Sequence, residues 1–374
     1  MQWSLFLLIL MGQCFFFTCH PYKYHFIKEN KTWDEAQKYC REKHTDLATV
    51  YDMTDMERLR YSKEKQEAVW IGLRSNPETD NRTWHWSLPG VEFNDSETKT
   101  KWDTTEPNDC QGNTENCVRM DKPDWKWKDD QCDNHHNFIC YNEKQEPNKN
   151  FHLITNALCW PEAQNYCREH HTDLVSGLNQ LNDPDLKEQI HSYDVWIGLF
   201  RDTWRWSDGS HFSFRNWHVE LFPDDDSKKC AKCAMTMLNG TGKWNSDDCN
   251  IKRSFFCYKD RFVLIEENKT WEDALYYCRE NYNDLASITN LKEQRWIQQK
   301  AKNASTPFVW LGLRYTCTLE FWFWVSDEVV GYKNWASGVR NDECDMSGGM
   351  ERGGEHKWSS RPDNNMYNFI CSTF

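Results

Sequence analysis

The stretch T-W-D-E-A-Q-K-Y-C, residues 32–40, decides the fold of this chain, because related stretches return at residues 159–167 and 270–278. Thr32 and Glu35 have the spacing of a capping box, in which each side chain accepts a hydrogen bond from the other residue's backbone N–H. The stretch therefore predicts a helix with a tryptophan near its beginning and a cysteine near its end. Three such helices indicate three copies of one unit.

The rest of the unit follows the same order in each copy. A V-W-(I/L)-G-L segment is followed by a pair of tryptophans one residue apart, and the copy closes on F-(I/F)-C. The segments are Val69–Leu73, Val195–Leu199 and Val309–Leu313, then Trp84/Trp86, Trp204/Trp206 and Trp322/Trp324, then Cys140, Cys257 and Cys371. A period of more than 100 residues is that of whole domains and not of a solenoid. We expect domains at residues 22–142, 148–258 and 260–374.

The elements after the first helix predict an α+β fold. Thr54–Glu57 is a possible start of a second helix that runs to about Glu67, and Asn290–Glu293 is a similar start in the third copy. Short apolar and aromatic runs then predict strands, separated by loops with Gly, Asn and Pro. In the first copy these runs are Val69–Leu73, Trp84–Trp86, Cys117–Met120 and Asn137–Tyr141. Helices followed by short strands and one long irregular loop indicate an α+β domain, and such a loop is usually functional.

Composition and charge exclude several kinds of partner. The chain has 374 residues, 21 of them tryptophan, and a net charge of −13. That charge argues against nucleic acid, whose phosphates require a basic surface, and against an anionic membrane surface. The apolar segment within residues 1–19 predicts a cleaved secretory signal, and no later stretch has the ~18 apolar residues of a membrane span.

The cysteines and glycosylation sequons indicate an extracellular, secreted protein. Of 17 cysteines, all but Cys14 and Cys19 lie beyond the predicted signal. Such density in an exported chain indicates disulfides. Asn-x-Ser/Thr sequons fit the same compartment and predict a glycoprotein. They stand at Asn30, Asn81, Asn94, Asn239, Asn268 and Asn303.

Together, the helix with Trp and Cys, W-I-G-L, E-P-N, C-V-x-M, W-x-D-x-x-C and F-I-C resemble the C-type lectin-like domain, three times in tandem. The arrangement is similar to a short secreted relative of the macrophage mannose receptor. The resemblance implies a disulfide from the first helix to the last strand of each domain and a second one across the long loop. The implied pairs are Cys40–Cys140, Cys117–Cys132, Cys167–Cys257, Cys233–Cys249 and Cys278–Cys371.

Five further cysteines fall outside this pattern. The third copy has Asp363 where the partner of the loop cysteine is expected, so Cys344 has Cys317 as an alternative partner. Cys110, Cys159 and Cys230 are also additional, and spacing does not decide their pairing. An odd total leaves one thiol for an intermolecular bond, which makes an oligomer possible.

The resemblance also implies a calcium and sugar site in the first copy, at Glu106, Asn108, Glu115 and Asp129. All four supply oxygen, the ligand atom that calcium collects. The family's Glu-Pro-Asn form implies mannose-type sugars. Lys128 takes the place of an asparagine, and an ammonium is a donor without acceptor capacity. Either Ca²⁺ binds more weakly without that ligand, or Lys128 lies among the carboxylates and replaces the ion; a solvated acidic loop with an ordinary salt bridge is the plain alternative.

The second and third copies have lost this donor set. In the second copy Phe222-Pro223-Asp224 replaces Glu106-Pro107-Asn108, Ala231 replaces Glu115, and Asn245-Ser246 forms the later pair. The third copy keeps only Asp342 and Ser359-Ser360 in these positions. We expect neither copy to hold the family's cation.

The sequence thus predicts a secreted recognition protein that binds mannose-type glycans with Ca²⁺ through its first domain. The alternative is a calcium-independent scaffold with a protein ligand and no sugar site. None of the motifs of zinc proteases, serine hydrolases or phosphate-binding loops is present, so we expect no enzyme.

Overall fold

The computed structural model describes residues 20–61, 68–75, 82–109, 114–121, 124–143, 150–190, 194–221, 232–238, 242–338 and 343–374. It forms two compact units, one of residues 24–258 and one of residues 259–374 with the described residues before Tyr24. The predicted signal at residues 1–19 lies outside the described part of the chain. Among the described helices, none combines the length and apolar character that crossing a membrane requires.

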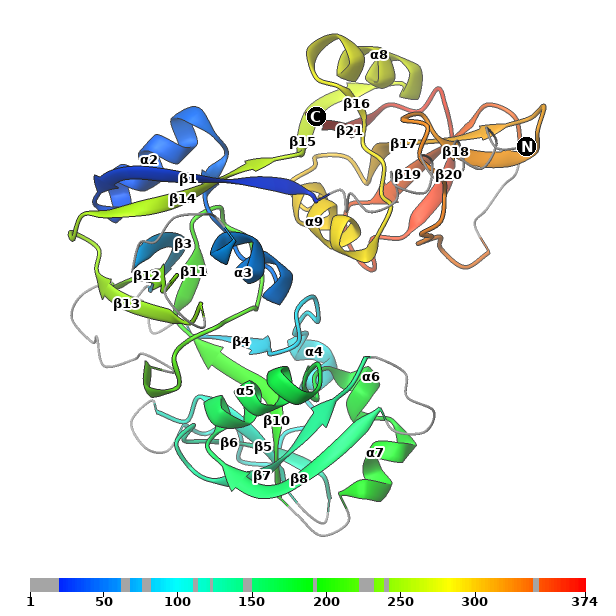
Figure 1. The fold of residues 1–374 in the computed structure, drawn as a ribbon. Helices are drawn as coiled ribbons and strands as arrows, with labels where there is room; N and C mark the ends of the chain where they lie inside the picture. The colour runs from blue at the N-terminus through cyan, green and yellow to red at the C-terminus, as the bar shows by residue number, and fades with distance from the viewer. Residues whose placement is uncertain are drawn as a thin grey trace, which may run out of the picture. The chain divides into compact units, whose positions relative to one another are not determined.

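The unit of residues 24–258 contains two sheets, and each takes strands from both the first and the second repeat (Figure 1). One sheet has the order β1 (Tyr22–Lys31), β14 (Arg253–Asp260), β3 (Val69–Ser75), β12 (Lys232–Thr236) and β13 (Trp244–Asp248), with β2 (Asp46–Leu47) beside β14 and β11 (Trp204–Trp206) beside β3. Its helices are α2 (Trp33–Lys43), α3 (Met53–Arg60) and the 3₁₀ turn η2 (Val219–Leu221). We call residues 24–75 with 204–258 module 1.

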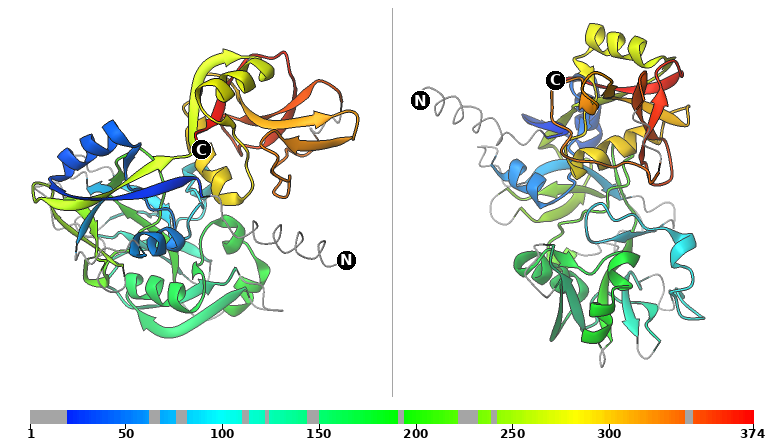
Figure 2. Two further views of the ribbon diagram at one scale, coloured as in Figure 1. Left: turned by 45° about the horizontal axis from the view of Figure 1, so that its top comes forward. Right: turned by 90° about the vertical axis from the view of Figure 1, so that its right-hand side faces the viewer.

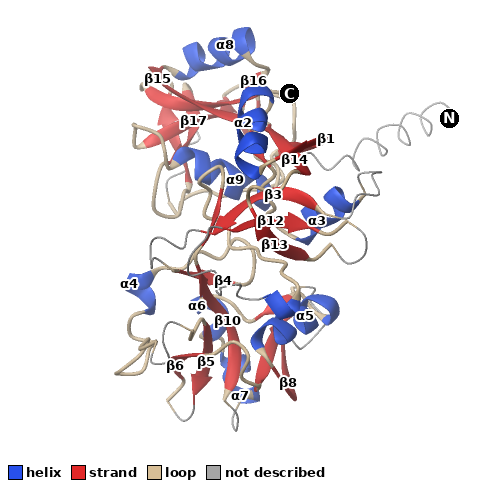
Figure 3. Ribbon diagram, turned by 90° about the vertical axis from the view of Figure 1, so that its left-hand side faces the viewer, coloured by secondary structure: helices blue, strands red, loops and turns tan. Residues whose placement is uncertain are grey.

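Module 2, residues 82–202, contains the second sheet. Its order is β6 (Lys126–Asp130), β5 (Cys117–Asp121), β10 (Val195–Asp202), β7 (His136–Tyr141) and β8 (Phe151–Leu158), with β4 (Thr83–Trp86) beside β10 and β9 (Asp173–Leu174) beside β7. Its helices are α4 (Asp95–Thr98), α5 (Trp160–His170), α6 (Leu178–Leu181) and α7 (Pro184–Gln189). Helix α5 packs against β7 and β10 (Figure 3).

Module 3 is built from the third repeat alone. Its sheet has the order β15 (Phe262–Lys269), β21 (Tyr367–Ser372), β17 (Phe308–Thr316), β19 (Met346–Glu351) and β20 (Trp358–Pro362), with β16 (Asp284–Leu285) beside β21 and β18 (Phe321–Trp324) beside β17. Helix α8 (Trp271–Asn281) contacts β15, β17 and β21, and α9 (Leu291–Ala301) contacts β15 (Figure 2). The α+β class predicted from the sequence is confirmed in all three modules.

The three modules share one packing rule at the start of the first helix. The indole N–H of that helix's tryptophan donates to a carbonyl of the central strand over 2.8 Å in every module. The pairs are Trp33 with Ile71, Trp160 with Ile197, and Trp271 with Leu311. The glycine in the same strand is required by a close approach: a Cβ on Gly198 would lie 2.9 Å from the carbonyl oxygen of Val175. The repeated motifs are therefore the contacts that join helix to sheet.

Modules 1 and 2 arise because the first two repeats exchange their second halves at one β-hairpin. In module 3, β17 turns back and pairs with β18. In the first two repeats the hairpin is open. Leu73 of β3 instead pairs with Trp206 of β11, and Leu199 of β10 pairs with Trp86 of β4. The boundaries 22–142 and 148–258 therefore mark sequence repeats, whereas each folded module combines halves of both.

The connection in the second repeat explains why the hairpin opens. If β10 and β11 paired in the register of module 3, Arg201 would face Trp204 and only Asp202 and Thr203 would form the turn. Two-residue hairpin turns need positive φ at their central positions and favour Asn-Gly or Gly-containing pairs, for which a β-branched threonine is unsuited. Here β10 ends at Asp202 and β11 begins at Trp204, and the two strands belong to different sheets, so the chain passes directly into the other module. Short hinge loops favour such exchange of identical elements.

The exchange changes two of the predicted disulfides. Cys117–Cys132, Cys233–Cys249 and Cys278–Cys371 are present as expected, and Cys317 pairs with Cys344. The predicted Cys40–Cys140 and Cys167–Cys257 pairs are wrong: the structure has Cys40–Cys257 and Cys140–Cys167. The reason is that β14 of the second repeat lies in module 1 beside the first helix, and β7 of the first repeat lies in module 2. Modules 1 and 2 each keep the expected bond between first helix and last strand, with the partner supplied by the other repeat.

The remaining cysteine and helix predictions are partly confirmed. Cys159 is a free thiol, and partial burial raises its pKa to about 11, which makes it a poor nucleophile at neutral pH. Cys110 and Cys230 lie outside the described residues. The capping box of α2 is present, with hydrogen bonds of 3.0 and 3.3 Å between Thr32 and Glu35.

The second helix of the first repeat begins earlier than predicted. Asp52, rather than Thr54, caps α3, because its carboxylate accepts the N–H of Asp55 over 2.9 Å. The described helix ends at Arg60, and residues 62–67 lie outside the described part of the chain. In the third repeat Asn290 caps α9 as predicted, with the N–H of Glu293 as donor.

Candidate functional site

The long loop of the first repeat starts from a fixed aromatic base in module 2. Trp127 of β6 donates its backbone N–H to the carbonyl of Lys101, and Asp103 donates to the carbonyl of Trp127, over 2.9 and 3.0 Å. The ring of Trp102 meets Trp127 edge to face at 5.7 Å. The loop then reaches Glu106, whose peptide bond to Pro107 is cis. The residues after this base are therefore held close to the end of β6.

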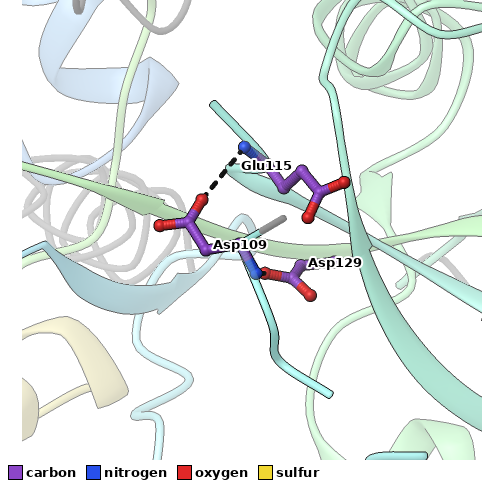
Figure 4. Close-up of side chains that lie close together, drawn as sticks. All are labelled: Asp109, Glu115 and Asp129. Carbon is purple, nitrogen blue, oxygen red and sulfur yellow. Dashed lines mark hydrogen bonds between the residues drawn. The ribbon is translucent and has the colours of Figure 1, made fainter. Parts of the chain in front are cut away.

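Three carboxylates converge at this loop: Asp109, Glu115 and Asp129 (Figure 4). One possible ligand oxygen from each lies within 4.8 Å of the others. Asp129 and Glu115 are buried, at 6% and 8% exposure, and Asp109 is partly buried. The carboxylate of Asp129 accepts the backbone N–H groups of Asn108 and Asp109 over 3.0 and 3.1 Å. The loop thus folds around Asp129, and among the described residues this is the group suited by type and spacing to hold a cation.

The other two predicted ligands border this cluster in different ways. Partial burial and the adjacent carboxyl of Asp129 raise the pKa of Glu106 to about 7, which shows how closely negative groups are gathered. Asn108 is exposed, and its backbone N–H donates to Glu106 over 3.1 Å as well as to Asp129. The structure therefore brings Glu115 and Asp129 together, places Glu106 beside Asp129, and gives Asn108 a backbone contact.

Lys128 does not lie in the cluster. Successive side chains of a strand point to opposite faces, so Asp129 faces the cluster and Lys128 faces away from it. The Lys128 ammonium contacts Asp121 at 2.9 Å and Asp103 at 3.4 Å, and the hydrogen bond to Asp121 raises its pKa. Replacement of the ion by this ammonium, one of the two predicted outcomes, is not observed. Instead, Lys128 forms an ordinary salt bridge.

Two arginines that the sequence analysis missed do reach the cluster. Arg201 places Nη2 at 2.7 Å from Asp129 and 3.1 Å from Asp109, and its guanidinium also donates to the carbonyl of Glu115 over 2.7 and 3.1 Å. Arg82 pairs with Asp109 and donates to the side chain of Asn116 over 2.7 Å. Arg82 stands in the first repeat, but Arg201 belongs to the second. No pattern within the first repeat could have indicated Arg201, because only the exchange of β10 brings it here.

The donor set fits a hard cation in chemistry and in charge. Asp109, Glu115 and Asp129 provide three carboxylates against two guanidinium groups, and Glu106, with its raised pKa, adds a fourth carboxyl group, so negative charge is in excess in a partly buried place. Calcium favours such carboxylate oxygens and tolerates irregular coordination. Against this, Arg201 already contacts two of the three converging carboxylates. Calcium bound here would be held by Asp109, Glu115 and Asp129, with Glu106 at its border, and it would supply coordination for two hydroxyls of a sugar.

The later repeats offer little in the equivalent places. In the second repeat, residues 222–231 lie outside the described part of the chain, and Asn245 and Ser246 of β13 are partly buried. In the third repeat Asp342 also lies outside it, whereas Ser359 and Ser360 are buried in β20. Among the described residues of these two repeats, no group of three or more acidic, histidine or cysteine side chains is spaced to hold a metal.

Comparison with known proteins supports the division of the sequence into three repeats. The family model "Lectin C-type domain" matches residues 29–142, 156–259 and 267–373. The chain is similar to C-type mannose receptor 2 of Homo sapiens, at 24% identity over 388 residues, covering 84% of this chain and 26% of the receptor. It is also similar to lymphocyte antigen 75 of Homo sapiens, at 26% identity over 366 residues, covering 81% of this chain and 20% of that protein. The chain spans about a quarter or less of the length of these curated relatives.

The solved structures that are similar each match a part of this chain about as long as one repeat. Human lithostathine has 25% sequence identity and a TM-score of 0.28, covering 29% of this chain and 80% of that one. A calcium-independent type II antifreeze protein has 27% identity and a TM-score of 0.27, covering 29% and 82%. The family matches cover most of the chain and coincide with all three repeats. The chain belongs to the C-type lectin domain family, as a protein of three tandem lectin repeats.

Proposed function

We propose that the chain is a carbohydrate-recognition protein whose first repeat binds a divalent cation and, with it, glycans of mannose type. The observation that carries this proposal is the convergence of Asp109, Glu115 and Asp129 beside Glu106, with Lys128 turned away. The excess of negative charge supports a cation at this place. Calcium would fix two neighbouring sugar hydroxyls, and Glu106 with Asn108 would accept and donate hydrogen bonds to them.

The second and third repeats then act as scaffold or as separate binding surfaces without the family's cation. We expect a single sugar site of this kind to bind weakly, so useful affinity depends on several sites meeting an array of glycans. The proposal therefore includes an extracellular, secreted protein that acts by binding and not by catalysis. The names support a binding role, since the family model is called a lectin domain and one relative is called a mannose receptor.

The test uses the whole chain, because the first repeat does not fold as a module of its own. Calcium is titrated by calorimetry, and retention on immobilised mannan is measured in calcium and in EDTA. We expect retention that EDTA abolishes and that free mannose, but not galactose, competes. Changing Glu106→Gln together with Asn108→Asp should shift the competition toward galactose, as the family's Gln-Pro-Asp form implies. Retention that is equal in EDTA would overturn the calcium-dependent proposal.

One observation favours a second candidate, a calcium-independent ligand-binding scaffold. Arg201 contacts Asp129 and Asp109 with its guanidinium and neutralises part of the cluster without any ion. This candidate predicts no heat of binding when calcium is titrated and no retention on mannan. It also predicts the same melting temperature in EDTA as in calcium. Its ligand would then be a protein or another surface.

A further inference from the structure

Arg201 occupies a place that the first repeat's own sequence would give to a serine. In the aligned segments V-W-I-G-L-R-S and V-W-I-G-L-F-R, Ser75 and Arg201 are equivalent. Their strands have equivalent registers, since Arg74 pairs with Cys233 and Phe200 pairs with Cys117. If the first repeat closed its own hairpin, the short hydroxyl side chain of Ser75 would stand in the place of Arg201 beside the carboxylates of Asp109 and Asp129.

The behaviour of Ser75 in module 1 shows what that hydroxyl does. Its Oγ accepts the backbone N–H of Lys232 over 2.8 Å and donates to the carbonyl of the same residue over 3.3 Å. In module 2 the backbone N–H of Arg201 donates to the carbonyl of Asn116 over 2.8 Å, and the side chain extends on to the carboxylates. The exchange of halves therefore adds a positive charge to the site.

The guanidinium is fixed in position by contacts on every side. Two of its nitrogens donate to the carbonyl of Glu115, and its plane lies over the ring of Trp84 at 4.5 Å. Arg201 is 8% exposed, so solvent screens its charge poorly. Its Nη2 stands at hydrogen-bond distance from both Asp109 and Asp129. Calcium held by Asp109 and Asp129 would need the carboxylate groups that this nitrogen already contacts.

We propose that Arg201, delivered by the second repeat, is a built-in cation of the first repeat's site and sets its calcium affinity by competing with the ion for Asp109 and Asp129. This inference rests on the proposed function for its biological meaning. It adds that the cation affinity of one repeat is decided by a residue of the next. A closed first repeat, with Ser75 in that place, would have the stronger calcium site.

The test compares Arg201→Ser and Arg201→Gln with Lys128→Ser in the full chain. Lys128→Ser is the matched control, because it removes a positive charge near the loop but outside the cluster. Each variant is titrated with calcium, and its melting temperature is measured in EDTA and in calcium. Arg201→Gln keeps most of the side-chain size and a donor for the Glu115 carbonyl, so it remains informative if Arg201→Ser folds poorly.

We expect both Arg201 variants to bind calcium at least about tenfold more tightly than the natural chain, and the control to change by less than about threefold. In EDTA the Arg201 variants should melt lower, and calcium but not an equal ionic strength of sodium should restore them. The proposal would be overturned by folded Arg201 variants that bind calcium no more tightly than the natural chain and whose melting temperature calcium does not raise. If the variants gain calcium binding while the natural chain shows neither calcium binding nor retention on mannan, the inference stands and the proposed function fails. If the natural chain binds calcium and is retained on mannan but the variants bind calcium no better, the proposed function stands and the inference fails.

Discussion

The closed hairpin of the third repeat and the open hairpins of the first two are made from similar strands. The closed hairpin gives a module built from one repeat, whereas the open hairpins give modules that combine halves of two repeats. In module 3, Thr316 pairs with Phe321 and the intervening residues make the turn. In the second repeat, Asp202 and Thr203 alone are available for that turn, and the strand runs on. Both arrangements form the same strand pairs and the same helix-to-sheet contacts. The comparison teaches that the connection, and not the strands, selects which half belongs to which module.

A second difference strengthens the open arrangement at the crossover. Asp202 is buried and contacts Arg215 at 2.8 Å, while His85 of module 2 lies 3.6 Å away. Burial alone would raise the pKa of Asp202, but the charge of Arg215 and the contact with His85 hold it well below its usual range. The residue that would sit in a tight turn is thus the centre of a buried ionic contact between the two modules.

The largest expected effect is a change of disulfide pairing. Inserting Gly-Asn-Gly-Ser between Asp202 and Thr203 gives the second repeat a connection long enough to close, so each repeat should fold on itself. Peptide mapping without reduction should then find Cys40–Cys140 and Cys167–Cys257 in place of Cys40–Cys257 and Cys140–Cys167.

The same insertion between Leu319 and Glu320 is the control, since that hairpin is already closed. It should leave Cys278–Cys371 in place. An unchanged map in the second-repeat variant would show that hinge length does not select the exchange.

The next effect concerns Asp202 itself. Asp202→Asn leaves Arg215, which is 1% exposed, without its charged partner, and the free energy of unfolding should fall by about 3–5 kcal/mol. Because the folded pKa of Asp202 is depressed, its contribution is present above the unfolded pKa and is lost as the pH falls below about 4. Urea unfolding at pH 7 and at pH 3 measures both. Asp34→Asn, which removes an exposed ion pair, should change little; an equally small loss for Asp202→Asn would contradict the assigned role.

The smallest effect is expected in the closed hairpin. Cys317–Cys344 joins its turn to the following loop, so changing both cysteines to serine should cost about 2–4 kcal/mol. The pairing of Cys278 with Cys371 should persist, because the turn itself closes the hairpin. Thermal melting with non-reducing mapping tests this. Loss of the Cys278–Cys371 bond would mean that the staple, and not the turn, keeps the third repeat closed.

The sequence was sufficient for most of the structure that is local to a repeat. The capping box at Thr32 and Glu35, the tryptophan of each first helix and the strands after it are present, because each depends on neighbours in the chain or on a fixed spacing. The direction of Lys128 follows from strand alternation, but residues 126–130 were not predicted as a strand. The partner of Cys40 could not be predicted by pattern, since Cys140 and Cys257 end the same motif and fit the same place. Arg201 was missed for the same reason: its strand and β3 are interchangeable in the first repeat's site.

The exchanged disulfides have one more consequence. Cys40–Cys257 and Cys140–Cys167 both cross the junction between β7 and β8, where the first repeat passes into the second. A protease that cuts the chain once between Cys140 and Cys167 would release no fragment, because two covalent bridges still join the pieces. Tandem domains with disulfides only inside each repeat separate after one cut in the linker, but these two repeats would remain a single molecule until the disulfides are reduced.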